Sequence, residues 1–397
     1  MSRPITVVQW WPNYPKSPSS GLQRFIEIAQ RCHEEGWRSY LVCTKMPDDT
    51  GLIEPFRKAG CELIVQPRQR REFDLACIWR TYRLLRRLRC DILHCNQAQT
   101  SLLIGAFLAG VPARVWSVLA MSPYYEKNTR PKGLHRLMLS NRVSGLLSHR
   151  ILAISEAVGL ELRRQGVPGE SIDTVHVPVD YARFAEAVDG DIRHSLRLDP
   201  SLILITAVGH AFPVKGWDIA LQAFARVLKE IPHVRLLLVG GIDTNEREKR
   251  YFQELTDLSK NLSVSDHVYF LGKRNDIPGI LKASDIFIFP SRSEGMGSAL
   301  IEAIAAGLPC IAARVGGIPD VITHGENGFL FERENVEELA SHLIRLIEDQ
   351  QLRERVASNA SKRARAFSME GYVDKVFECY KALLSRNCAR ISENDAT

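Results

Sequence analysis

Short apolar runs alternate with longer amphipathic segments from the N-terminus to about Asp180. Runs rich in Val, Ile, Leu and aromatic residues predict strands, and apolar residues spaced three and four apart predict helices. The predicted strands are Ile5–Trp11, Tyr40–Thr44, Glu62–Val65, Asp91–Cys95, Ala113–Leu119 and Arg150–Ala153, and the predicted helices are Leu22–Glu35, Leu75–Leu88 and Ser101–Leu108. This alternation is typical of a parallel sheet with helices on both faces.

The same alternation starts again near residue 201. The predicted strands are Leu202–Val208, Arg235–Gly241, His267–Leu271, Ile286–Phe289 and Pro309–Ala313, separated by the helices Trp217–Leu228, 246–260 and 298–306. After residue 334 the pattern is helical, over Val336–Glu348, Leu352–Phe367 and Met369–Leu384. The polar stretch Tyr181–Pro200 lies between the two periodic regions and predicts a hinge.

We therefore expect an α/β protein of two doubly wound domains, which 397 residues are enough to build. The expected divisions are a first domain at 1–185, a second at 186–368, a helix at 369–388 and a disordered tail at 389–397. Ligands of such sheets bind at the carboxyl ends of the strands.

Composition excludes several classes of protein. Hydrophobic content of 45% and charged content of 25% are ordinary for a soluble globular chain. No apolar run approaches the length of a membrane-spanning helix, and the N-terminus lacks the pattern of a signal peptide. Nine scattered cysteines without a Cys-x-x-Cys pair favour a reducing cytoplasm over a disulfide framework or zinc site.

The charge is distributed unevenly. The segment 1–180 holds 25 Lys and Arg against 16 Asp and Glu, a net charge of +9, and the remainder is net negative. The basic residues are densest in Arg80–Arg89 and in Lys127–Arg150. Such a face can contact anionic lipids at the inner side of a membrane, or an anionic acceptor, or it can simply be solvated. We expect no nucleic-acid binding, because no aromatic residues suited to stacking on bases are interleaved.

Two carboxylates flank a glycine turn in the segment 290–309. Glu294 precedes the turn Gly295–Gly297, and Glu302 follows it in an apolar helix. A strand, a glycine loop and a helix N-terminus together form a site for an anionic group. Acids would repel a bare phosphate, but carboxylates accept hydrogen bonds from sugar hydroxyls. The segment therefore predicts a phosphate flanked by sugars, which is a nucleotide sugar.

Residues 201–332 carry a series of motifs in a specific order. They are Ala207–Gly216, Val239–Gly241, Phe270–Gly272, Ser284–Ser291, Glu294–Gly297, Glu302–Pro309, Gly316–Pro319 and Asn327–Gly328. In this order they resemble the donor-binding domain of the retaining GT-B glycosyltransferases of family four, the glycosyl transferases group 1. The resemblance implies two Rossmann-like domains facing each other across a cleft, a C-terminal helix that returns to the first domain, and a nucleotide diphosphate sugar as donor.

The resemblance also implies roles for residues of the second half. Glu294 would bind hydroxyls of the donor sugar and Glu302 the ribose of the nucleotide. Lys215 lies in a loop before a helix, where it can neutralise charge on the leaving diphosphate. The remaining donor contacts would be Gly295, Met296, Gly297 and Ser298 around the helix start, with Arg274 near the nucleobase or phosphate.

Some positions depart from the family's usual pattern. His210 stands where the family usually has an arginine, and Ser117 where many relatives have a histidine near the end of a strand. Three alternatives follow: Ser117, together with Tyr124 or Tyr125, does the work of that histidine, the acceptor chemistry differs, or activity is lost. Gly21 resembles part of the family's glycine loop before the first long helix, and His94 its strand-ending histidine. The basic loop 127–132 is a candidate acceptor contact.

No metal or other cofactor is expected. The only closely spaced acids of the Asp-x-Asp type, Asp189 and Asp191, lie in the predicted hinge rather than at a strand end. Lys215 and the dipole of the helix starting at 298 would then balance the diphosphate charge in place of a cation.

The leading hypothesis is a retaining, metal-independent glycosyltransferase that moves a hexose-type sugar from a nucleotide diphosphate sugar to a hydroxyl. The expected acceptor is a polysaccharide or a lipid-linked precursor, as in lipopolysaccharide synthesis, or alternatively a small natural product. Two further hypotheses stay open: a nucleotide-sugar epimerase or phosphorylase, and a nucleotide-sugar-binding protein without transfer.

Overall fold

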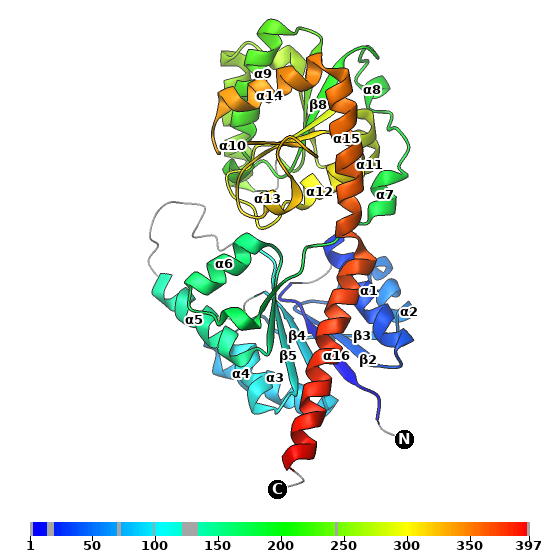
Figure 1. Ribbon diagram of the computed structural model, residues 1–397, viewed down its shortest axis with the longest axis vertical. Coiled ribbons are helices and arrows are strands. Elements are labelled where there is room, and N and C mark those ends of the chain that lie inside the picture. The colour runs from blue at the N-terminus through cyan, green and yellow to red at the C-terminus, as the bar shows by residue number, and fades with distance from the viewer. Residues whose placement is uncertain are drawn as a thin grey trace. The chain divides into compact units, whose positions relative to one another are not determined.

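The computed structural model describes residues 3–13, 20–69, 73–97, 100–120, 134–242 and 245–394 (Figure 1). The chain divides into two compact units. Unit 1 contains the described residues up to 178 together with 369–394, and unit 2 contains the described residues of 179–368.

Unit 1 is built on a seven-stranded sheet in the order β3-β2-β1-β4-β5-β6-β7. Its strands are β1 (Thr6–Trp10), β2 (Arg38–Cys43), β3 (Cys61–Val65), β4 (Ile92–Asn96), β5 (Ala113–Val118), β6 (Arg150–Ala153) and β7 (Ile172–Thr174). All neighbouring strands pair in parallel. The central strands β1 and β4 are buried along their whole length, as expected of a parallel sheet covered on both faces.

Helices cover this sheet in layers. They are α1 (Ser20–Glu34), α2 (Glu54–Lys58), α3 (Leu75–Leu88), α4 (Thr100–Leu108), α5 (Leu134–Leu147), α6 (Glu156–Arg164) and α16 (Met369–Asn394). On one face, α1 and α16 pack over a core that includes Val7, Ile92 and Val115 of the strands. Elsewhere α3 packs against α4, and α4 against α5 (Figure 1). The side chain of Asp74 starts α3 by accepting a hydrogen bond from the amide of Cys77.

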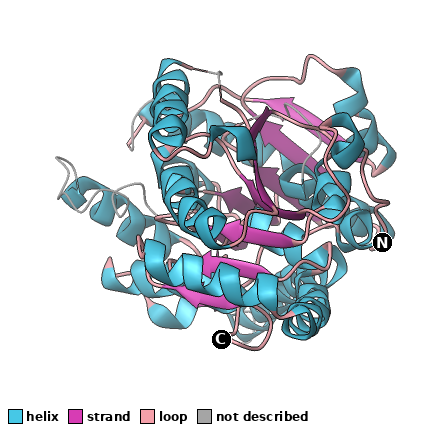
Figure 2. Ribbon diagram, turned by 90° about the horizontal axis from the view of Figure 1, so that it is seen from above, coloured by secondary structure: helices cyan, strands magenta, loops and turns pink. Residues whose placement is uncertain are grey.

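Unit 2 has a six-stranded parallel sheet in the order β10-β9-β8-β11-β12-β13. The strands are β8 (Ile203–Val208), β9 (Val234–Val239), β10 (Val268–Gly272), β11 (Ile286–Phe289), β12 (Cys310–Ala313) and β13 (Phe329–Phe331). The helices are α7 (Tyr181–Ala185), α8 (Ile192–Ser195), α9 (Trp217–Glu230), α10 (Glu246–Asn261), α11 (Ile277–Ala283), α12 (Ser298–Ala305), α13 (Ile318–Val321), α14 (Val336–Glu348) and α15 (Gln350–Ala364). Figure 2 shows strands enclosed by helices, the arrangement that the alternating pattern predicts.

The predicted fold class is confirmed, since both sheets are parallel and doubly wound. The bounds of α3, α14, β6 and β11 agree with the sequence prediction to the residue. Several elements were not predicted: α2, α5, α6, α7, α8, α11, α13, β7 and β13. Most of these have three to seven residues, too few for a periodic pattern to emerge, whereas α5 lies in the basic stretch Lys127–Arg150.

Helix α16 belongs to unit 1, although it follows unit 2 in the sequence. Its residues Tyr372, Val376 and Tyr380 are buried in the core with the strands, so the predicted return of the C-terminal helix to the first domain is confirmed. The helix continues to Asn394, into the stretch 389–394 that we expected to be an unstructured tail.

The expected hinge at 181–200 is packed into unit 2. Helix α7 contacts α12, the amide of Gly190 donates to the carbonyl of Gly279 over 3.0 Å, and Arg193 forms an ion pair with Asp285 at 2.8 Å. The chain passes between the units next to residues 179 and 368 instead. These two segments pair with each other, since the amide of Val179 donates to the carbonyl of Phe367 over 2.8 Å.

Candidate functional site

Two residues that are distant in sequence form an ion pair at the carboxyl ends of adjacent strands. Lys215 ends a short 3-10 turn after β8, and Glu294 lies in the loop between β11 and α12. The Nζ atom of Lys215 lies 2.6 Å from Oε1 of Glu294. The side chains are 26% and 11% exposed, so the pair is shielded but still reached by solvent. The structure thus brings together two of the predicted catalytic residues in a charge-assisted hydrogen bond.

A cluster of contacts centred on Arg292 connects these two loops. Arg292, two residues before Glu294, binds both carboxylate oxygens of Asp218 at 2.9 and 2.7 Å and the carbonyl of Pro213 at 2.5 Å. Its backbone amide donates to the carbonyl of Val214 over 2.7 Å. The positions of Lys215 and Glu294 relative to each other therefore depend on Arg292 and Asp218, which the sequence analysis missed because neither stands in a motif of the family.

The Arg292–Asp218 contact holds both groups in their charged forms. Burial would raise the pKa of the Asp218 carboxyl, but hydrogen bonds from Arg292 and Tyr251 outweigh burial and lower that pKa below its usual value. The hydrogen bond to Asp218 in turn raises the pKa of Arg292. The Tyr251 hydroxyl donates to Asp218 over 2.7 Å, and burial together with this anion raises the pKa of Tyr251. The cluster is accordingly insensitive to pH near neutrality.

Helix α12 follows a glycine at its N-cap position and has no side-chain cap. Gly297 precedes it with φ of +81°, and a Cβ atom there would lie 2.7 Å from Cδ1 of Ile318. Because the first turn of a helix has amides without intrahelical partners, this start suits an anionic group. Gly316, with φ of +50°, lies so close to Glu294 that a Cβ atom would be 1.8 Å from the Glu294 carbonyl oxygen. Glycine at both positions therefore permits the close packing around the loop of Glu294.

The other predicted donor-side residues occupy varied environments in unit 2. Ser298 is exposed as the first residue of α12, Gly295 and Glu302 are half-buried, and the side chain of Met296 is buried. Glu302 lies in the second turn of α12, after Gly297 and Ser298. These placements leave the individual donor roles as predictions.

Arg274 and His210 both have an acidic neighbour. The guanidinium of Arg274 binds both oxygens of Asp276 at 2.8 and 2.5 Å, so an approaching phosphate would compete with that carboxylate. His210 follows β8 and is 64% exposed, with its Nδ1 atom 3.8 Å from Oε1 of the buried Glu248. Neither residue contacts Lys215 or Glu294 through any hydrogen bond or ion pair of the described chain.

In unit 1, the predicted residues His94 and Ser117 form one buried network. The ring of His94 lies between two hydroxyls, with Nε2 2.7 Å from Oγ of Ser117 and Nδ1 2.6 Å from the hydroxyl of Tyr380. All three side chains are almost completely buried. Burial lowers the pKa of His94 to about 3, so the ring is neutral, with one nitrogen donating and the other accepting. This network joins β4 and β5 to α16, a contact that no local sequence pattern predicts.

Gly21 lies within a helix rather than in the predicted glycine loop. We expected it in a loop before the first long helix, but α1 starts at Ser20 and contains Gly21 in its first turn. The backbone of Gly21 has no positive φ, so the residue can join the helix directly. Tyr124, Tyr125 and the loop 127–132 lie outside the described residues.

Comparisons with known proteins identify the class. The family described as Glycosyltransferase Family 4 matches residues 20–183, and the family described as Glycosyl transferases group 1 matches residues 189–363. Together they span most of the chain, leaving out β1 and α16 of unit 1.

Characterised relatives resemble the chain over most of its length. The UDP-Gal:α-D-GlcNAc-diphosphoundecaprenol α-1,3-galactosyltransferase of Escherichia coli is 29% identical, over 77% of this chain and 79% of that protein. The N-acetyl-α-D-glucosaminyl L-malate synthase of Bacillus anthracis is also 29% identical, over 93% and 94%. HepE of Anabaena, solved in complex with UDP, superposes with a TM-score of 0.78 over 95% of this chain and 100% of that one, at 21% identity.

The chain therefore belongs to the group 1 glycosyltransferases of family four, which confirms the resemblance seen in the motifs. It is a glycosyltransferase of the GT-B fold that uses a nucleotide-sugar donor.

The contacts of Arg292 predict that replacing this residue lowers activity, although Arg292 itself has no proposed role in the reaction. Replacing Arg292 with Gln removes the paired contact with Asp218, so Lys215 and Glu294 are no longer held in register, and we expect kcat/KM for the donor to fall about tenfold or more. Steady-state kinetics would measure this. Arg314→Gln is the matched control, because Arg314 of the same unit forms an ion pair with Glu332 at 3.0 Å and should keep activity within about twofold. Equal losses in both variants would contradict the positioning role.

The buried His94 predicts that stability falls in acid. In the folded chain His94 stays neutral until the pH falls to about 3, whereas its ordinary pKa is 6.5. The unfolded chain therefore binds the extra proton between these values, and His94 should cost about 2 kcal/mol of stability between pH 7 and pH 5. Denaturant unfolding at both pH values would measure this, with His94→Gln showing a smaller loss. The same loss in wild type and variant would rule out His94 as its source.

Proposed function

We propose that this glycosyltransferase transfers a hexose-type sugar from a UDP-sugar to a lipid-linked glycan, with retention of anomeric configuration and without a metal ion. The observation that carries the proposal is the Lys215–Glu294 pair, 2.6 Å apart, in which Glu294 belongs to the loop that leads through Gly297 into α12. This pair brings a cation next to a carboxylate in unit 2, and the loop of that carboxylate leads to the start of a helix, where an anion would be favoured.

The donor would use each of these groups differently. Its diphosphate accepts hydrogen bonds from the first amides of α12, where the helix dipole favours negative charge. The ammonium of Lys215 has three N–H donors, of which Glu294 takes one and two remain for phosphate oxygens. Glu294 still has free lone pairs for hydroxyls of the transferred sugar, and Glu302 would accept from the ribose.

The reaction follows from these contacts. The bond between the anomeric carbon and the leaving phosphate oxygen breaks, and charge builds up on the diphosphate next to Lys215. The acceptor hydroxyl enters on the face that the nucleotide leaves, and its proton passes to the departing phosphate oxygen. The new glycosidic bond then has the configuration of the old one. Lys215 and the amides of α12 stabilise the developing charge, which is the main task of such a site.

Metal independence rests on this local positive charge. A divalent cation in a diphosphate site balances charge on the leaving group, and here an ammonium and a helix N-terminus are available for the same purpose. The carboxylate of Glu294 is already held by that ammonium at 2.6 Å, which disfavours it as a ligand of a second cation.

The relatives support the choice of donor and acceptor. The E. coli relative is named for UDP-galactose and for a diphosphoundecaprenol acceptor, and HepE was solved with UDP. The Bacillus relative is named for L-malate, a small acceptor. We favour the lipid-linked acceptor because the segment 1–180 carries a net charge of +9, which attracts a diphosphate. In the described part of the chain, every helix is too short or too polar to cross a bilayer.

The reaction can be tested with the purified chain. It would be incubated with UDP-glucose, UDP-galactose, UDP-N-acetylglucosamine and GDP-mannose, each with an undecaprenyl-diphosphate-linked sugar as acceptor, with and without EDTA. We expect transfer from a UDP-sugar, an α-linkage by NMR from the α-linked donor, and rates in EDTA within about twofold of the control. A β-linked product would exclude retention, loss of the rate in EDTA would exclude metal independence, and free epimerised sugar would favour the epimerase hypothesis.

Substitutions in unit 2 would separate the proposed roles. Lys215→Ala should lower kcat by about 10²–10³, because charge on the leaving group is no longer stabilised. Glu302→Ala should mainly raise KM for the donor, since the ribose contact is present in both ground and transition states. Lys229→Ala, an exposed lysine of α9, serves as the control. If Lys215→Ala and Glu302→Ala bind and turn over the donor like this control, the site assignment is wrong.

A further inference from the structure

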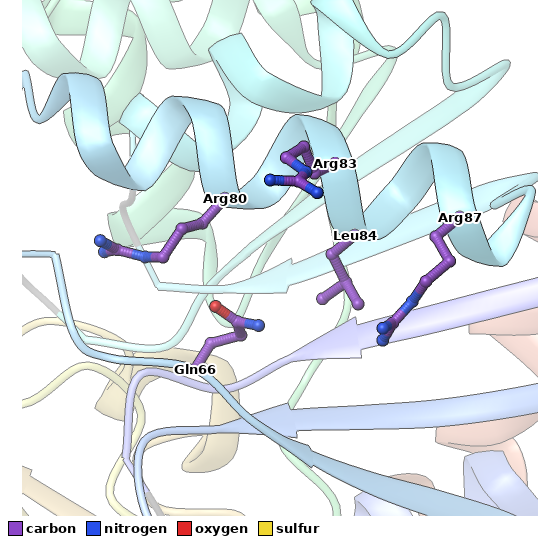
Figure 3. A pocket seen from close by; sticks show the side chains of 5 residues that line it. All are labelled: Gln66, Arg80, Arg83, Leu84 and Arg87. Atoms are coloured by element: carbon purple, nitrogen blue, oxygen red, sulfur yellow. The ribbon is translucent and has the colours of Figure 1, made fainter.

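Unit 1 contains a pocket lined by arginines, none of which is a predicted donor-site residue. It has a volume of about 490 Å³ and lies between α3 and the segment after β3 (Figure 3). We call this cavity the arginine pocket. It is lined by Gln66, Arg80, Arg83, Leu84 and Arg87. Figure 3 shows Arg80 and Arg87 extending from α3 on the side that faces Gln66.

The helical spacing explains why these side chains converge. Arg80, Arg83 and Arg87 follow one another at intervals of three and four, which places them along one side of α3. Arg86 lies between them in sequence but does not line the pocket. Leu84 is buried against the core and forms the apolar floor of the cavity.

The positive charge of the pocket is not balanced within the described protein. Helix α3, from Leu75 to Leu88, has no acidic residue. Successive side chains of β3 point to opposite faces of the sheet. Cys61 and Leu63 pack toward α1 and α2, so the side chain of Glu62 between them lies on the other face, which is the side of α3. Nevertheless, among the described residues no ion pair joins Glu62 or any other acid to the three arginines. Like charges at these spacings repel each other, and a bound anion would relieve that repulsion.

The chemistry of the lining selects phosphate among anions. A guanidinium presents a planar fork of N–H donors that pairs with two oxygens of a phosphate. Three such forks, with the amide of Gln66, match a group that has several anionic oxygens. The volume is in the range of ligand pockets and exceeds what a single phosphate fills, so the phosphate would be part of a larger molecule.

An exposed apolar strip adjoins the arginine pocket on the same helix. Leu75 is 82% exposed and Trp79 is 58% exposed. Trp79 stacks on Tyr82 with ring centroids 5.5 Å apart, and the guanidinium of Arg83 lies 5.9 Å from the centre of the Trp79 ring. A helix side with arginines next to exposed Leu and Trp is typical of a contact with the interface of a lipid layer. A ligand that suits both sides has a phosphate and an apolar chain.

We propose that the arginine pocket binds the phosphate head group of a lipid. The three guanidinium groups hold the phosphate oxygens, while Leu75 and Trp79 contact the start of the acyl or prenyl chains. This site belongs to unit 1 and needs no residue of the proposed donor site, so it goes beyond the transfer reaction and would anchor the enzyme at a lipid surface through phosphate.

The test uses the full chain and two probes. Vesicles of phosphatidylcholine with and without phosphatidylglycerol report binding to a lipid phosphate by sedimentation, and inorganic pyrophosphate reports binding of a soluble phosphate by calorimetry. Arg87→Gln is compared with Arg86→Gln, because the two arginines are adjacent, both exposed and equally charged, while only Arg87 lines the pocket. UDP binding is measured on the same samples to follow the donor site independently.

We expect Arg87→Gln to weaken binding of phosphatidylglycerol vesicles about tenfold, as for a lost hydrogen bond between charged groups, with Arg86→Gln within about twofold of wild type. Pyrophosphate should displace the chain from vesicles, and UDP binding should not change in either variant. If pyrophosphate binding is weakened by Arg87→Gln but the chain does not bind vesicles, the lipid is excluded as the ligand and a soluble phosphate compound takes its place. If Arg87→Gln and Arg86→Gln weaken vesicle binding equally, the arginine pocket is excluded as the binding site, because binding would then depend only on overall charge.

Discussion

The ion pair between Lys215 and Glu294 is the contact on which the proposed donor site depends. The two residues come from loops after neighbouring parallel strands, β8 and β11, whose carboxyl ends necessarily meet at one edge of the sheet. Strand pairing alone brings the loops only near each other. The Arg292–Asp218 contact and the close approach of Gly316 to the Glu294 carbonyl determine their register. Because the two charges are preorganised, the proposed transfer would need little rearrangement when charge develops on the leaving diphosphate.

Unit 1 uses its buried polar groups differently. His94, Ser117 and Tyr380 satisfy one another's hydrogen bonds away from water, and burial keeps the histidine neutral. Such a network stabilises only when every member has a partner. Here one partner, Tyr380, comes from α16, 286 positions after His94 in the chain. The core of unit 1 is therefore completed only when the chain has passed through unit 2 and returned.

The two units also differ in charge. In unit 2, the arginines near the site are paired with acids, as Arg292 is with Asp218 and Arg274 with Asp276. In unit 1, the arginines of α3 that line the pocket have no such partner in the described structure, and apolar side chains beside them are exposed. Paired charges fix loops in place, whereas unpaired charges on a surface are available to a ligand. The proposed division of work, with the donor on unit 2 and an anionic lipid or acceptor on unit 1, follows this difference.

The sequence by itself determined the alternation of strands and helices, the two-unit fold class and the donor motifs, because periodicity and glycine turns are local properties of the chain. It also singled out Lys215, Glu294 and the basic stretch Arg80–Arg89. Only the tertiary structure decided which of these residues meet. The Arg292–Asp218 cluster, the contact of His94 with Tyr380 and the pocket formed with Gln66 all join residues from different elements. Such contacts depend on strand order and helix packing, which no local pattern encodes, and this is why their chemistry emerged only in the folded chain.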